Sequence, residues 1–143
     1  MVDFPGVPGK MCDWDVVQAV AGAEKALRCI SKHANIYIAT GASESTETDI
    51  KTAFHRVGFD KYITGYFCKA NLGIGKEDRA FFSRILDKLE TPPRRVTMVG
   101  DSFTKDIEPA KAFGMNVIWF CQKKLEHHID DIRTISSLEE LCA

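Results

Sequence analysis

Short apolar runs alternate along the chain with longer segments in which apolar residues recur at helical spacing. The apolar runs predict strands near residues 35–40, 62–67, 95–100 and 116–120. The periodic segments predict helices at about 15–32, 46–57, 77–90 and 106–113, with one or two more helices at the C-terminal end. Strands separated by helices pair through right-handed crossovers. We therefore expect an α/β fold with a doubly wound, Rossmann-like parallel sheet and helices on both faces, three layers in all.

Helical periodicity is clearest in two of these segments. The first stripe consists of Val16, Val20, Ala23, Leu27 and Ile30, and the second of Phe81, Phe82, Ile85, Leu86 and Leu89. Residues at this spacing share one face of a helix, and that face packs on the core. Near the end of the chain, Ser136 and Glu139 have the spacing of a capping box and predict the start of the last helix.

Residues 96–107 are the most informative stretch, because a predicted strand there ends in two carboxylates. The strand is predicted to be buried, since it contains Val96, Met98 and Val99. Gly100 lets the chain bend sharply, and Asp101 and Asp106 follow within a tight turn. Two ionised carboxylates at one strand end repel each other unless a hard cation such as Mg²⁺ lies between them. A divalent metal site is therefore one interpretation of Asp101 and Asp106.

An ordinary structural interpretation of the same residues stays open. Asp106 stands where a side-chain oxygen can cap the following helix, and Asp101 would then be solvated. Pro109 falls in the first turn of that helix, where its missing N–H costs nothing, and Gly114 ends the helix.

Two other segments contain residues suited to binding phosphate. The strand at 35–40 ends in Thr40 and Gly41, so a hydroxyl and the amides of small residues can approach an anion. Lys76 follows a glycine-rich loop just before the helix at 77–90, where its ammonium could neutralise carboxylates and a phosphate together. Each signal alone is also typical of an ordinary cap or a solvated lysine.

Taken in order, these motifs resemble the haloacid dehalogenase superfamily. Thr40 matches its second motif, Lys76 its third, and the run Gly100-Asp101-Ser102 with Asp106-Ile107 its fourth. The resemblance extends from about Ala19 to the C-terminus. It implies that the whole chain, residues 1–143, is a single core domain of this family, shortened at its N-terminus. The few residues between Cys68 and Lys76 leave no room for a large cap domain there.

The resemblance also implies an activity. The chain resembles a Mg²⁺-dependent phosphohydrolase of this superfamily, which would act on a small phosphate ester through an aspartyl-phosphate intermediate. By this resemblance, Asp3, Thr40 and Lys76 are the candidate catalytic residues, Thr40, Gly41 and Lys76 would bind phosphate, and Asp101 and Asp106 would bind Mg²⁺.

The first motif of the family, which supplies the nucleophile, has no clean copy here. Asp3 has a glycine and a β-branched residue after it, but Pro5 occupies the position of the acid/base carboxylate. Asp13 and Asp15 have the required spacing, but they precede the first apolar stripe and are typical of charges at a helix N-terminus. Asp3, Asp13 and no residue at all therefore remain alternatives for the nucleophile.

Other function classes follow from these alternatives. Without a nucleophile, the chain would be a non-catalytic relative that binds a phosphate ligand or a partner. A receiver domain also uses aspartates, a threonine and a lysine, but its acidic pair precedes its lysine, which is the reverse of the order here. In the family the first-motif strand lies between the strands that would carry Thr40 and Asp101. Its loss would leave two strand edges, which self-association could cover.

Composition excludes several partners. The 143 residues and 45% hydrophobic content suit one compact domain, and a net charge of −1 gives no basic surface for nucleic acid. No apolar run reaches membrane-spanning length and no signal segment opens the chain, so we expect a cytoplasmic protein. The cysteines are odd in number and lack a Cys-x-x-Cys pair, so we expect reduced thiols: Cys12, Cys29, Cys68, Cys121 and Cys142. His127 and His128 are expected on the solvated face of a helix.

Overall fold

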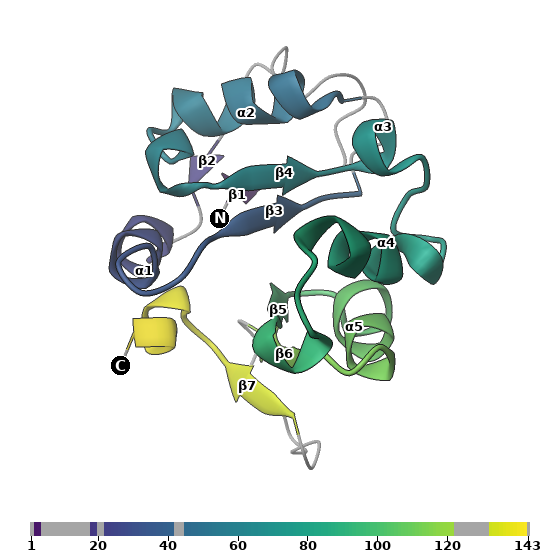
Figure 1. The fold of residues 1–143 in the computed structure, drawn as a ribbon. Coiled ribbons are helices and arrows are strands. Elements are labelled where there is room, and N and C mark those ends of the chain that lie inside the picture. The colour runs from purple at the N-terminus through teal and green to yellow at the C-terminus, as the bar shows by residue number, and fades with distance from the viewer. Residues whose placement is uncertain (1, 4–17, 20–21, 42–44, 122–131, 143) are drawn as a thin grey trace.

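The computed structural model describes residues 2–3, 18–19, 22–41, 45–121 and 132–142 (Figure 1). Its helices are α1 (Ala23–Ile30), α2 (Glu47–Arg56), α3 (Lys69–Leu72), α4 (Ala80–Leu89) and α5 (Glu108–Ala112). Its strands are β1 (Val2–Asp3), β2 (Gln18–Ala19), β3 (Tyr37–Ala39), β4 (Gly65–Phe67), β5 (Thr97–Gly100), β6 (Asn116–Phe120) and β7 (Arg133–Ile135). Short 3-10 helices cover Asp60–Tyr62, Pro93–Arg95 and Leu138–Cys142, and a π-helical turn covers Phe103–Ile107. None of the described helices is long and apolar enough to cross a membrane.

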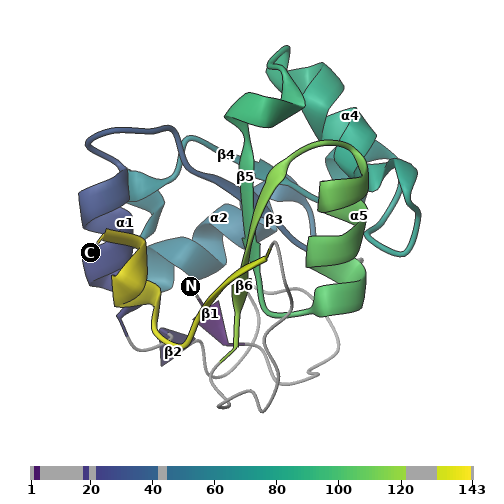
Figure 2. The ribbon, with the colours of Figure 1, turned by 90° about the horizontal axis from the view of Figure 1, so that it is seen from below.

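Parallel strands with helices on both faces confirm the predicted α/β fold. β3 pairs in parallel with β4, and β6 pairs in parallel with β5 on one side and β7 on the other. In this register Gly100 of β5 lies opposite Trp119 of β6. Figure 2 shows α1 and α2 on one side of these strands and α4 and α5 on the other, which is the predicted three-layer arrangement.

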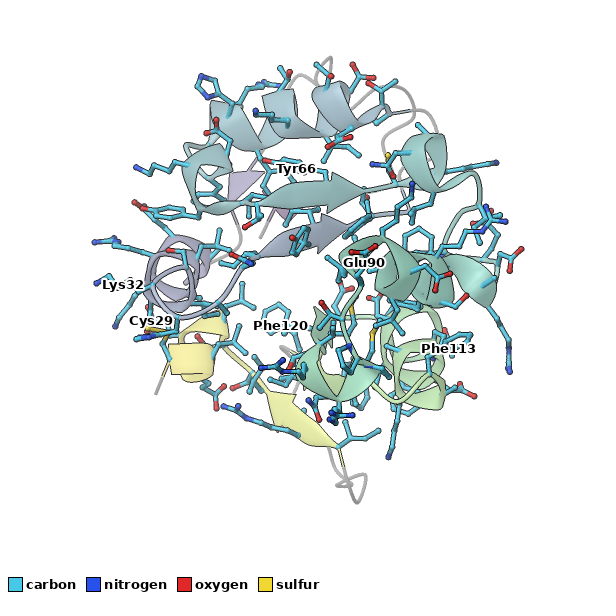
Figure 3. All side chains as sticks on the ribbon, viewed as in Figure 1. Cys29, Lys32, Tyr66, Glu90, Phe113 and Phe120 are labelled. Carbon is cyan, nitrogen blue, oxygen red and sulfur yellow. A yellow bond between two sulfur atoms is a disulfide. The ribbon has the colours of Figure 1, made fainter. Side chains whose placement is uncertain are left out.

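The apolar side chains form a core on each face of the sheet. On the α1 and α2 face the largest fully buried side chains are Phe54 and Ile50. Tyr66, labelled in Figure 3, packs edge-on against Phe54. Burial raises the pKa of Tyr66 to about 12. On the α4 and α5 face the core contains Leu72, Phe81, Phe82, Ile85, Ala110 and Met115. The predicted stripe on α4 is therefore confirmed as a packing face.

The sequence predicts the loss of a strand between β3 and β5, and none of the described strands pairs with both of them. β1 does form a short strand at Val2–Asp3, but it pairs antiparallel with β2 and not with β3 or β5. Within the described part of the chain, β3–β4 and β5–β6–β7 are separate hydrogen-bonded groups. β5 is thus an edge of its own group, and Val96, Met98 and Val99 are half-buried rather than buried. Self-association over such edges stays a prediction.

Near both ends of the chain, the observed elements differ from the predicted helices. Gln18–Ala19 is a strand, and α1 begins only after Gly22, whose φ of 80° lies in the left-handed region. A side chain at Gly22 would also meet Glu139, with Cγ 2.9 Å from the added Cβ. Toward the C-terminus, β7 was not predicted, and the expected last helix is a 3-10 helix. Its start is held by Glu140 rather than Glu139, because Glu140 Oε2 accepts the amide of Ser136 at 2.7 Å. His127 and His128 lie outside the described residues.

A disulfide contradicts the prediction that the cysteines are reduced thiols. Cys29 of α1 is bonded to Cys142, 113 residues away, with the Cα atoms 6.3 Å apart (Figure 3). The pairing arises because α1 packs beside the 3-10 helix at Leu138–Cys142, and no spacing rule in the sequence reveals that contact. Cys68 is a buried free thiol.

Candidate phosphate- and metal-binding site

The candidate site begins where β5 ends. Asp101 and Ser102 lie between the last residue of β5 and the π-helical turn at Phe103–Ile107. Ser102 caps this turn, because its Oγ accepts a hydrogen bond from the Lys105 amide at 3.3 Å. The amide of Ile107 donates to the carbonyl of Ser102 at 3.3 Å, which is the wider spacing of a π-helix. The predicted capping role of Asp106 is therefore wrong. The turn instead places the side chain of Asp106 next to Gly100, at the end of β5.

Gly100 is required here by close packing and not by an unusual backbone angle. Its φ is not among the positive values, whereas a Cβ at this position would lie 2.5 Å from Cβ and Oδ2 of Asp106. Real Cβ atoms do not approach other atoms so closely. The chain does bend at Asp101, directly after this glycine, as predicted, and Gly100 also makes room for the Asp106 side chain. Pro109 in the first turn of α5 and Gly114 after it, with φ 88°, agree with their predicted places.

Lys76 and Asp106 form a buried ion pair at this edge. Lys76 Nζ lies 2.7 Å from Asp106 Oδ1, and the two side chains are only 15% and 6% exposed. The second oxygen of Asp106, Oδ2, accepts the amide of Ser102 at 3.3 Å. Both carboxylate oxygens therefore have a donor. The ammonium has three N–H groups, and its pair with Asp106 occupies one of them.

The loop between α3 and α4 holds Lys76 in place. α3 ends at Gly73, whose φ is 80°. Gly75 is buried, and an added side chain there would collide with the carboxylate of Glu77. After Lys76, Asp78 Oδ1 accepts the Ala80 amide at 2.9 Å as α4 begins. The glycine-rich composition noted in the sequence thus reflects a tight, closely packed loop.

Thr40 and Gly41 lie on the adjacent strand end. The amide of Thr40 donates to the carbonyl of Phe67 at 3.0 Å and so extends the β3–β4 pairing by one residue. A Cβ at Gly41 would lie 3.7 Å from Cδ of Lys76, which is ordinary contact distance. Gly41 therefore lies beside the stem of Lys76. The structure brings together the second, third and fourth motifs, which are far apart in the sequence.

The carboxylates at this edge suit a cation whose coordination is completed by phosphate and water. Asp101 is exposed at the strand end, and Asp106 is buried beside it in the turn. Among the described residues no three His, Cys, Asp or Glu side chains gather closely enough to enclose a metal ion. Mg²⁺ commonly uses only one or two carboxylates, with substrate phosphate and water completing its octahedron. Two carboxylates at this edge fit that pattern.

Of the two candidate nucleophiles, Asp3 belongs to the described residues. Asp3 lies in β1, opposite Gln18 of β2, and so its backbone belongs to the antiparallel pair. Asp13, Asp15 and Pro5 lie outside the described residues.

Two residues at this edge were missed by sequence reasoning. Trp119, at the end of β6, donates its indole N–H to the carbonyl oxygen of Asp101 at 3.1 Å. Phe103 packs edge-on against the Trp119 ring, with centroids 5.2 Å apart. The position of Trp119 could have been inferred from the sequence, because the predicted strand at 116–120 ends at the same edge as the strand at 95–100.

Comparison with known proteins agrees with this geometry. The family model for the haloacid dehalogenase-like hydrolases matches residues 8–114. The chain therefore belongs to this hydrolase family, and the resemblance inferred from its motifs is confirmed.

Two curated relatives share part of this sequence. The glyceraldehyde 3-phosphate phosphatase of Methanocaldococcus jannaschii is 32% identical over 60% of this chain and 39% of its own length. The pyrimidine 5'-nucleotidase PynA of Streptococcus pneumoniae is 27% identical over 78% of this chain and 46% of its own length. The chain thus spans less than half the length of either relative.

Solved structures with the same fold include members of this family. The HAD-hydrolase YfnB from Bacillus subtilis, solved bound to magnesium, has a TM-score of 0.71 and 18% identity over 87% of this chain and 54% of its own. An uncharacterized protein from Listeria monocytogenes has a TM-score of 0.77 and 18% identity over 92% of this chain and 81% of its own. At these identities the likeness establishes the fold alone.

Proposed function

We propose that the chain is a Mg²⁺-dependent phosphohydrolase that acts on a small phosphate ester. The observation that carries the proposal is the buried pair of Lys76 and Asp106, 2.7 Å apart, beside Gly41 at the neighbouring strand end. A buried ammonium with donors to spare, next to a strand end that offers a hydroxyl and amides, favours an oxyanion. The phosphatase and nucleotidase named among the relatives support the same substrate class.

Thr40, Gly41 and Lys76 would bind the phosphate group. The Thr40 hydroxyl and the amide of Gly41 would donate to its oxygens, and Lys76 would supply positive charge. Asp106 holds the ammonium of Lys76 at the strand end, so that the charge is already in place when phosphate arrives. This arrangement orients phosphate and lowers its repulsion toward an attacking carboxylate.

Asp101 and Asp106 would hold Mg²⁺, the first through its exposed carboxylate. When bound, the cation would neutralise charge on the phosphate oxygens. Lys76 and a bound cation would together balance the negative charges of Asp106 and the substrate phosphate.

Asp3 is the proposed nucleophile. Its carboxylate would attack phosphorus as the ester P–O bond breaks, and the leaving oxygen would take the electron pair of that bond and a proton from solvent. Water would then hydrolyse the aspartyl phosphate to inorganic phosphate and regenerate Asp3. Pro5 stands two residues later, where the family has an acid/base carboxylate, and it can neither protonate a leaving group nor activate water. Loss of such a group lowers a rate by about two to four orders of magnitude. We therefore expect slow turnover.

A second function is favoured by the place of β1. Asp3 belongs to an antiparallel pair with Gln18, and not to a strand between β3 and β5. If the carboxylate does not reach the phosphate, the chain would be a phosphate-binding module without turnover.

The experiment is Mg²⁺-dependent release of nitrophenol from nitrophenyl phosphate by the wild type, Asp3→Asn and Asp13→Asn. The proposal expects turnover at least about a hundredfold below that of an active relative, lost in Asp3→Asn and retained in Asp13→Asn. Loss in Asp13→Asn alone would contradict the assignment of Asp3. Complete inactivity of a wild type that still binds phosphate would support the second function.

A further inference from the structure

Trp119 lies beside the end of β5, where Mg²⁺ is proposed to bind. It pairs with Gly100 across the parallel strands, and side chains of paired residues project from the same face of a sheet. Asp106 occupies the space above Gly100 on that face. The indole of Trp119 and the carboxylate of Asp106 therefore flank the end of β5 from the same side.

Two hydrogen bonds hold one peptide unit at this point. Trp119 Nε1 donates to the carbonyl oxygen of Asp101 at 3.1 Å, and the amide of Ser102 donates to Asp106 Oδ2 at 3.3 Å. The carbonyl of Asp101 and the amide of Ser102 belong to the same planar peptide group. The group is thus fixed at both of its polar atoms, although it lies outside both β5 and the π-helical turn.

The indole itself is held against rotation. Phe103 packs on it with an interplanar angle of 61° and ring centroids 5.2 Å apart. An indole N–H is a donor only and has a single direction, so a fixed ring gives a fixed hydrogen bond. The orientation of this peptide group restricts the backbone of Asp101, from which its exposed side chain extends.

We infer that Trp119 is a positioning residue for Asp101, and that its indole N–H sets the affinity of the site for a divalent cation. The inference rests on the proposed function, because it takes Asp101 as a metal ligand. Groups that orient ligands through hydrogen bonds commonly change metal affinity by about ten- to a hundredfold when removed. Trp119 acts through a backbone carbonyl, so we expect the lower end of that range, about tenfold.

The test is calorimetric titration of Mg²⁺ alone into the wild type, Trp119→Phe, Phe103→Leu and Asp101→Asn. Trp119→Phe keeps an aromatic ring and loses the N–H, whereas Phe103→Leu loses the ring contact and keeps the N–H. We expect the Mg²⁺ dissociation constant to rise about tenfold in Trp119→Phe and to change less than about twofold in Phe103→Leu. A merely structural role would weaken binding to a similar extent in both, and this result would overturn the inference.

A second measurement does not depend on the Trp119→Phe variant folding. In a Trp14→Phe background, Trp119 is the remaining tryptophan. Its emission should change on addition of Mg²⁺, and the change should be absent when Asp101→Asn is added. Unchanged emission together with Mg²⁺ binding that Asp101→Asn abolishes would overturn the inference and leave the proposed function standing. Equal heats in the wild type and Asp101→Asn would remove Asp101 from the metal site and overturn both.

Discussion

The ammonium of Lys76 lies 2.7 Å from Oδ1 of Asp106, although the two residues are 30 positions apart in the chain. Both side chains are largely buried, so removing either one leaves a charge with little water around it. The pair therefore links the loop before α4 to the turn after β5, and it does so at the edge where phosphate is proposed to bind.

The first prediction concerns the coupling of this pair. Lys76→Met and Asp106→Asn should each lower the free energy of unfolding by about 2 to 3 kcal/mol, because each leaves its partner unpaired. The double variant should lose less than the sum, by at least about 1 kcal/mol. Denaturant unfolding of the four proteins measures this coupling. Additive losses would show that the two charges do not depend on each other.

A second prediction concerns Gly100. Gly100→Ala would place a Cβ 2.5 Å from the side chain of Asp106, so the turn must shift or the carboxylate must leave its place. We expect a loss of about 1 to 3 kcal/mol of stability, as for other overpacked sites. Gly41→Ala is the matched control, since its nearest neighbour would be 3.7 Å away. Equal effects of the two substitutions would disprove the close-packing argument.

The disulfide gives a third prediction. Cys29 and Cys142 close a loop of 113 residues, so reduction should lower the free energy of unfolding by about 2 to 4 kcal/mol. Unfolding should be compared with and without reductant for the wild type and Cys29→Ser. The variant should match the reduced wild type, and reductant should not affect it further. If reductant left the free energy of unfolding of the wild type unchanged, the disulfide would not be stabilising.

Glu140 provides a pH-dependent prediction. Hydrogen bonds from the amides of Ser137 and Ser136 hold the pKa of this carboxyl below its ordinary value. The ionised form is thus favoured by folding, and its stabilisation is present above the unfolded pKa, about 4.3, and is lost as pH falls through the lower folded pKa. Glu140→Gln should therefore be less stable than the wild type at pH 7, with the difference shrinking below about pH 4. Glu139→Gln is the matched control, because it removes a neighbouring carboxylate that forms an exposed ion pair with Lys25.

Much of the fold followed from apolar periodicity. α2, α4 and β6 lie close to their predicted ranges, because each has a clear local pattern and local end signals. Thr40 and Asp101 could be placed at one edge before any coordinates, because parallel strands end there. Lys76 joined them only through the resemblance to the family.

The failures share a physical cause. α1 starts only after Gly22, whose φ of 80° is outside the helical region, and a side chain there would meet Glu139. The disulfide depends on contact between two helices that are distant in the sequence. The packing role of Gly100 depends on where a π-helical turn places Asp106. These features are set by tertiary contacts, and local sequence patterns do not encode them.

The central claim is that Thr40, Gly41 and Lys76 bind a phosphate-like anion, and thermal unfolding with phosphate or tungstate tests it most directly. At about ten times its dissociation constant, the anion should raise the wild-type melting temperature by about 4 °C. Each variant is compared with its own melting temperature without anion. The shift should vanish in Lys76→Ala and persist in Lys88→Ala, which removes an exposed lysine from α4. No shift in the wild type, or an equal shift in both variants, would contradict the account.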